Sequence, residues 1–129
     1  MKLRIKDNSI RLRLTQTEVE KIGNGDQIHN NLNFPGGERV SYLLAGSAVE
    51  NPEIDYKDNR ISISVPTEIL TIWANSNEVS LLYELSLDHD NVLKLLIEKD
   101  FACLTPREDE DESDLFPHPE QGENQCRKS

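Results

Sequence analysis

The chain repeats one structural unit, and this internal duplication is the strongest constraint on its fold. The first copy runs from about residue 2 to 44 and the second from about 53 to 96. Each reads as two strands, a short helix and two strands, because apolar residues first alternate with polar ones. The same apolar positions recur at Ile10, Leu12 and Leu14 in one copy and at Ile61, Ile63 and Val65 in the other.

Helix signals follow the first hairpin in both copies. Thr15 and Glu18 have the spacing of a capping box, and Pro66 suits a helix start. A one-residue shift then aligns Val19 with Ile69 and Ile22 with Ile72, so the predicted apolar face of the second helix contains Ile69, Ile72 and Trp73. The remaining strands are predicted at 28–34, 40–44, 79–87 and 92–97, with Val40, Leu43 and Leu44 aligned with Val92, Leu95 and Leu96.

These elements predict a β-rich α+β fold. Duplicated β-β-α-β-β units are expected to form a pseudo-two-fold barrel-like or two-sheet domain with two short helices, over residues 1–101. The strand order resembles small barrels built from two halves and the swapped-hairpin dimers of transcription regulators, a fold-level analogy that implies no activity. Residues 102–129 form an acidic C-terminal segment, expected to be partly docked and then flexible, with Phe101, Leu104, Leu115 and Phe116 as its anchors.

The net charge of the chain limits which classes of partner are expected. The net charge of −10 repels phosphates, which disfavours nucleic acid and anionic membranes, whereas basic partners or cations fit it better. A protein partner is compatible with this charge. The chain has no apolar run of the ~20 residues that a membrane span needs, and its alternating start does not resemble a signal peptide, so a cytoplasmic protein is expected. Its oligomeric state is left open.

Against this acidic background, the N-terminal hairpin is basic. Strand alternation places Lys2, Arg4 and Lys6 on one side of the first strand, and Arg11 and Arg13 on the polar side of the next. This stripe has three interpretations: a solvated sheet face, a docking strip for the acidic segment, or a nucleic-acid surface. The second copy carries Glu53, Asp55, Ser62 and Ser64 in place of these bases, so the fold does not require them.

Cys103 is the candidate for covalent chemistry, because Lys99 and Arg107 could lower its pKa. The alternative to a buried structural cysteine is a small enzyme or metal-binding protein centred on Cys103 and nearby carboxylates. A calcium-loop template can be laid on residues 109–120, but Asp114 replaces its essential glycine. The three histidines lack metal-ligand spacing. We therefore predict no catalytic residue, metal ligand or cofactor.

The two ends of the chain carry a resemblance. The start KLRIKDNSIRLRLT and the stretch IEKDFACLTPR, followed by acidic residues and Phe116-Pro117, resemble a family of short uncharacterised bacterial proteins. The resemblance implies a bacterial setting and includes residues 100–117 in the functional unit, and no site residue comes with it. The expected function is a non-enzymatic binding or interaction module, with Lys2, Arg4, Arg11, Arg13, Cys103 and Arg107 as candidate binding residues.

Overall fold

The computed structural model of the chain describes residues 1–100 and Phe116. The first copy contains β1 (Lys2–Lys6), β2 (Ser9–Leu14), α1 (Gln16–Gly23), β3 (Ile28–Asn33) and β4 (Arg39–Ser47). The second contains β5 (Glu53–Lys57), β6 (Arg60–Pro66), α2 (Thr67–Ala74), β7 (Ser80–Ser86) and β8 (Val92–Lys99). Each copy therefore has the predicted β-β-α-β-β order, and single 3-10 turns at Pro35–Gly37 and Asp88–Asp90 close the second hairpins.

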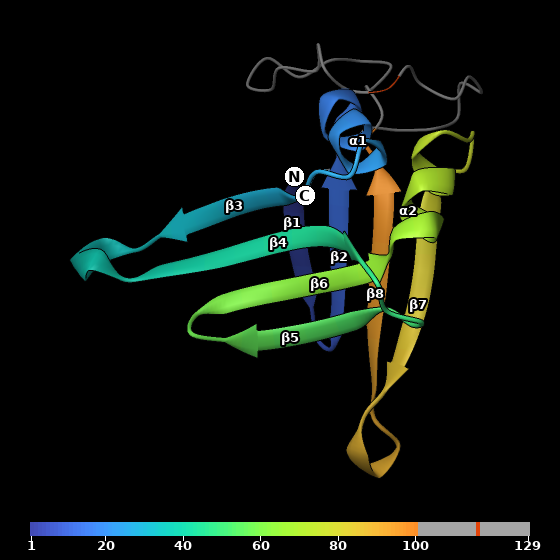
Figure 1. Cartoon of the computed structure of the whole chain (residues 1–129). Coiled ribbons are helices and arrows are strands. Elements are labelled where there is room, and N and C mark those ends of the chain that lie inside the picture. The colour runs from blue at the N-terminus through green and yellow to red at the C-terminus, as the bar shows by residue number, and fades with distance from the viewer. Residues whose placement is uncertain (101–115, 117–129) are drawn as a thin grey trace, which may run out of the picture.

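The two copies exchange hairpins to form two sheets. One sheet, sheet A, has the order β1-β2-β8-β7, and the other, sheet B, has the order β3-β4-β6-β5. Each combines one hairpin from each copy, joined by a central parallel pair, β2 with β8 or β4 with β6. The strands of the two sheets cross, and α1 and α2 lie together at one end (Figure 1). The two-sheet arrangement is confirmed, and the barrel-like alternative is not the one that the described strands adopt.

The core lies where the sheets cross and under the helices. It is formed by Ile10, Leu12, Leu14, Val19, Ile22, Ile28, Leu44, Ile63, Val65, Leu70, Trp73, Leu95 and Ile97. Strand alternation selects the strand residues among them, because every second side chain of a strand faces inward, and α1 and α2 contribute the other four. Each of the two described α-helices has eight residues, and no helix in this part of the chain is long and apolar enough to cross a membrane.

The sequence alignment of the two copies was wrong in detail at two places. The helices align without a shift, since α1 buries Val19 and Ile22 whereas α2 buries Leu70 and Trp73. Ile72, predicted to face the core, is 63% exposed. In the last strands, Leu44 pairs with Ile63 and Ile97 pairs with Leu12, so Leu44 corresponds to Ile97 and not to Leu96. A one-residue error reverses which side chains face the core.

The end of β8 breaks the symmetry with a buried lysine. Lys99 is 6% exposed, its Nζ donates to the Ser76 carbonyl at 2.7 Å, and it lies 5.3 Å from the Trp73 ring centroid and 5.7 Å from that of Phe116. The Phe116 amide donates to the Asp100 carbonyl at 2.8 Å. One predicted anchor of the C-terminal segment thus packs against the core, while Phe101, Leu104 and Leu115 lie outside the described residues.

Lys99 makes stability depend on pH. Burial lowers its pKa from 10.5, an effect that nearby Glu78 partly opposes. Because the unfolded chain then binds more protons between the lowered pKa and 10.5, the wild type gains stability as pH rises through this window. We expect the difference in unfolding free energy, wild type minus Lys99→Met, to increase between pH 7 and pH 10 in urea titrations. A difference that stays constant or decreases would contradict the expectation.

Candidate functional site

The register of β1 and β2 brings the four predicted basic residues of the hairpin into two directly opposed pairs. Lys2 lies opposite Arg13, and Arg4 lies opposite Arg11. Since Leu12 between the arginines is fully buried, these bases occupy the outer face of sheet A. Like charges placed opposite each other destabilise a sheet by roughly 0.2–1 kcal/mol per pair. Sequences break such local rules mainly at functional sites, which makes this cluster the candidate site.

Two carboxylates neutralise part of the cluster. Glu98 Oε1 lies 2.8 Å from Arg13 Nε and 3.5 Å from Arg11 Nε. Lys2 Nζ lies 3.2 Å from Oδ2 of the buried Asp100. Arg4 is exposed and has no ion pair or side-chain hydrogen bond to any other described residue. Among the described residues, the four bases thus outnumber these two carboxylates, and Arg4 is the base that makes no ion pair with either of them.

A pocket of about 420 Å³ adjoins these bases. It is lined by Met1, Lys2, Leu3, Arg4, Arg11, Arg13 and Tyr42. Residues 1–4 thus supply both a basic side and an apolar side of the pocket, because alternate residues of β1 point to opposite faces. Among the described strands, β1 pairs with β2 alone, so the pocket lies beside an open edge of sheet A.

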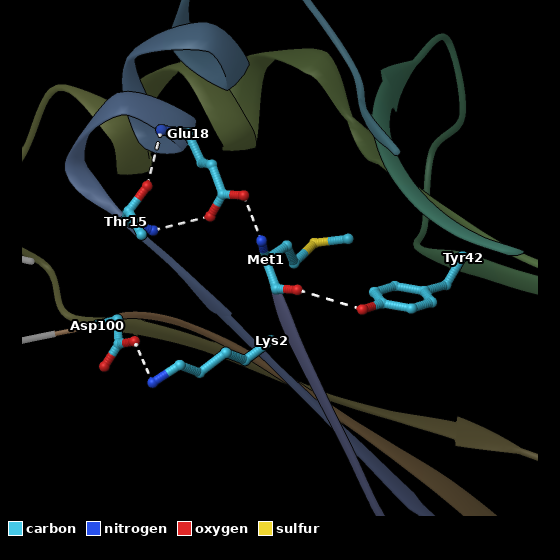
Figure 2. A network of polar contacts seen from close by, with 6 residues as sticks. All are labelled: Met1, Lys2, Thr15, Glu18, Tyr42 and Asp100. Atoms are coloured by element: carbon cyan, nitrogen blue, oxygen red, sulfur yellow. Dashed lines mark hydrogen bonds and ion pairs between the residues drawn. The ribbon is translucent and has the colours of Figure 1, made fainter. Parts of the chain in front are cut away.

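The start of β1 is fixed by a polar network that links both sheets to α1 (Figure 2). Glu18 completes the predicted capping box with Thr15 and also pairs with the Met1 amino group. The Tyr42 hydroxyl, on β4, donates to the Met1 carbonyl at 3.4 Å. Burial, and secondarily Glu18, raise the pKa of the Tyr42 phenol above 10.0, so it remains a donor at neutral pH. These contacts connect the Met1 end of the pocket wall to α1 and to β4.

The pseudo-equivalent surface of the second copy is different. Glu53 pairs with Ser64 and Asp55 with Ser62 on the outer face of sheet B. The corresponding position of Arg4 is therefore Asp55, in an otherwise similar hairpin. The same hairpin structure carries a basic cluster in one copy and an acidic strand in the other. The fold therefore does not require the basic residues.

Other predicted candidates lie elsewhere in the chain. Cys103, Arg107 and the calcium-loop template at 109–120 lie outside the described residues. His89 adopts a left-handed conformation in the turn before β8, as a turn residue does. Within residues 1–100 and Phe116, no group of three or more His, Cys, Asp or Glu side chains could hold a metal ion.

Sequence reasoning missed five residues that shape the site: Met1, Leu3, Tyr42, Glu98 and Asp100. Glu98 is distant from the hairpin in sequence, and only the parallel pairing of β2 with β8 places it beside Arg13. Tyr42 reaches the pocket from the other sheet. One signal was present in the sequence: Glu98 has the strand parity of an outer-face residue between the inward-facing Ile97 and Lys99.

These features define a duplicated two-sheet α+β domain with a basic pocket beside an edge strand. Over residues 1–120 the chain matches the model of a family of unknown function, DUF7009, and it belongs to that family. The resemblance to an uncharacterised family is thereby confirmed. Searches of the curated proteins and of the solved structures find no match to this chain.

Proposed function

We propose that the protein is a binding module that recognises an extended, acidic segment of a partner protein at the pocket beside β1. The observation that carries the proposal is the composition of this pocket. Lys2, Arg4, Arg11 and Arg13 supply its basic side, whereas Met1, Leu3 and Tyr42 supply its other side. Such a pocket fits a strand whose side chains alternate between acidic and apolar.

The open edge of β1 supports the same proposal. An extended peptide can add to a sheet edge through main-chain hydrogen bonds, while pockets for alternate side chains give specificity. Acidic side chains of the added strand would face Arg4 and Arg11 on the outer face of sheet A. Its apolar side chains would face Leu3 and Tyr42. The net charge of −10 opposes any anionic ligand at long range, and it opposes a segment with few carboxylates less than a polyphosphate.

The test is peptide binding measured by fluorescence anisotropy. We expect a short labelled peptide that alternates glutamate with valine to bind, and the same peptide with lysine in place of glutamate not to bind. Arg4→Glu should weaken binding roughly tenfold, because it replaces an exposed attraction with a repulsion and each contributes up to about 1 kcal/mol. Arg4 has no ion pair within the described part of the chain, so this change removes none of the ion pairs described there.

Arg60→Glu is the matched control. Arg60 is exposed on the pseudo-equivalent hairpin, and its reversal alters the net charge by the same amount. Equal weakening by Arg4→Glu and Arg60→Glu would show that only overall charge matters and would contradict a site at β1. Equal binding of the glutamate and lysine peptides would also contradict a site for acidic segments at β1.

A further inference from the structure

Two edge strands of the molecule have complementary side chains. The strand β1 is an edge of sheet A, and β5 is an edge of sheet B. On its outer face β1 carries Lys2, Arg4 and Lys6, whereas β5 carries Glu53 and Asp55, followed by Lys57 at its end. On their inner faces both strands are apolar, with Leu3 and Ile5 in β1 and Ile54 and Tyr56 in β5.

The far end of each edge strand leaves an apolar side chain uncovered. Ile5 is 59% exposed and Tyr56 is 62% exposed. These two residues are pseudo-equivalent, because Ile5 pairs with Ile10 in one hairpin and Tyr56 with Ile61 in the other. Among the described residues, β1 and β5 each have a hydrogen-bonded neighbour on one side only, and they belong to different sheets. Each molecule therefore presents a basic open edge at β1 and an acidic one at β5.

We propose that β5 of a second copy of this chain binds along β1 and extends sheet A by one strand. The inference rests on the proposed function: β5 of the second molecule is the acidic extended segment that binds beside β1. An antiparallel register with Arg4 opposite Asp55 brings Lys6 opposite Glu53 on the outer face. On the inner face, the same register brings Ile5 opposite Ile54 and Leu3 opposite Tyr56. Lys57 then lies opposite Lys2, whose ammonium is already paired with Asp100.

Pairing of identical edges is disfavoured by the same charges. Two β1 strands would place lysine and arginine side chains together, and two β5 strands would place Glu53 and Asp55 together. Like charges directly opposite each other are destabilising, and charged edge strands are a common protection against edge-to-edge association. The charge pattern thus disfavours both symmetric pairings of these two edges and favours the pairing of β1 with β5. This contact is heterologous, so repeated addition forms rings or open chains.

The contact is small, and its strength depends on salt. Two five-residue strands form a limited interface, for which we expect a dissociation constant on the order of 10–100 µM. Exposed ion pairs are screened by salt, so raising the ionic strength from about 0.05 M to about 0.5 M should weaken the association.

The test is sedimentation velocity of the full chain from about 5 µM to about 500 µM, a range that spans this affinity. The wild type should increase in mass beyond a dimer as its concentration rises. Two charge-reversed variants, R4E/K6E and E53K/D55K, should each remain monomeric. Their equimolar mixture should associate again, because the acidic β5 of the first variant can pair with the basic β1 of the second. All four positions are exposed, and circular dichroism verifies that each variant is folded.

R39E/R60E is the matched control, since it reverses two exposed bases of sheet B and should associate like the wild type. A wild type that stays monomeric at the highest concentration in low salt would overturn the proposal, as would a mixture of folded variants that fails to associate. The glutamate–valine peptide separates the two proposals. If it binds monomeric protein at the β1 site, only the self-association is wrong. If it does not bind and the protein is monomeric, both are wrong.

Discussion

Replacing Trp73 by alanine is expected to lower the free energy of unfolding by about 3–5 kcal/mol, the range for loss of a buried large aromatic side chain. Trp73, on α2, is fully buried in a core to which both sheets contribute side chains. Its ring also lies 5.3 Å from the buried Lys99 ammonium, so truncation removes a cation–π contact together with apolar packing. Chemical denaturation monitored by far-ultraviolet circular dichroism measures the change.

The adjacent residue supplies the control. Ile72 is 63% exposed although the helical pattern of the sequence placed it on the buried face. Ile72→Ala should therefore change the unfolding free energy by no more than about 0.5 kcal/mol, as expected for a surface substitution. Comparable losses from Trp73→Ala and Ile72→Ala would contradict the helix orientation described above.

Replacing Ile97 by alanine is expected to cost about 2–5 kcal/mol, since it removes a fully buried branched side chain. Ile97 lies in β8 and pairs with Leu12 across the parallel junction that joins the two copies. The substitution would leave a cavity beneath the central strands of sheet A, and the cost depends on how far the neighbouring side chains fill it. The same denaturation experiment measures the loss.

Leu96→Ala distinguishes the correct register from the one read from the sequence. Leu96 is half-buried on the outer face of sheet A, beside Arg11. Its truncation leaves the core intact and should cost about 1 kcal/mol, in proportion to the smaller apolar area that it covers. A larger loss from Leu96→Ala than from Ile97→Ala would reverse the assignment of the two faces.

The predicted elements were mostly right because their signals are local. The hairpins at β1–β2 and β5–β6 follow from period-two alternation, and Thr15 with Glu18 fixes the start of α1. The errors arose where the alignment of the copies depended on similar residue types. Ile69 and Ile72 resemble Val19 and Ile22, but burial against the crossed sheets selects Leu70 together with Trp73, the one residue of the predicted face that is fully buried. Packing decided which of two adjacent apolar residues faces inward.

The candidate site shows the same division between local and long-range information. Alternation placed Lys2, Arg4, Arg11 and Arg13 on one face, and the structure brings them to one pocket. Alternation could not indicate that Glu98 and Asp100 lie among these bases, because the ion pairs of Glu98 and Asp100 join the second copy to the first. Nor could it reveal Tyr42 as part of the pocket, since Tyr42 belongs to the other sheet.

The sequence by itself therefore determined the duplication, the strand and helix order, and the charge difference between the two hairpins. Alternation and capping are properties of neighbouring residues, and they need no tertiary contact to be read. Only the tertiary structure decided that the copies exchange hairpins, so that each sheet contains one hairpin from each copy. That choice rests on parallel pairing between strands far apart in the chain and on burial of both apolar faces in one core, neither of which a local pattern encodes.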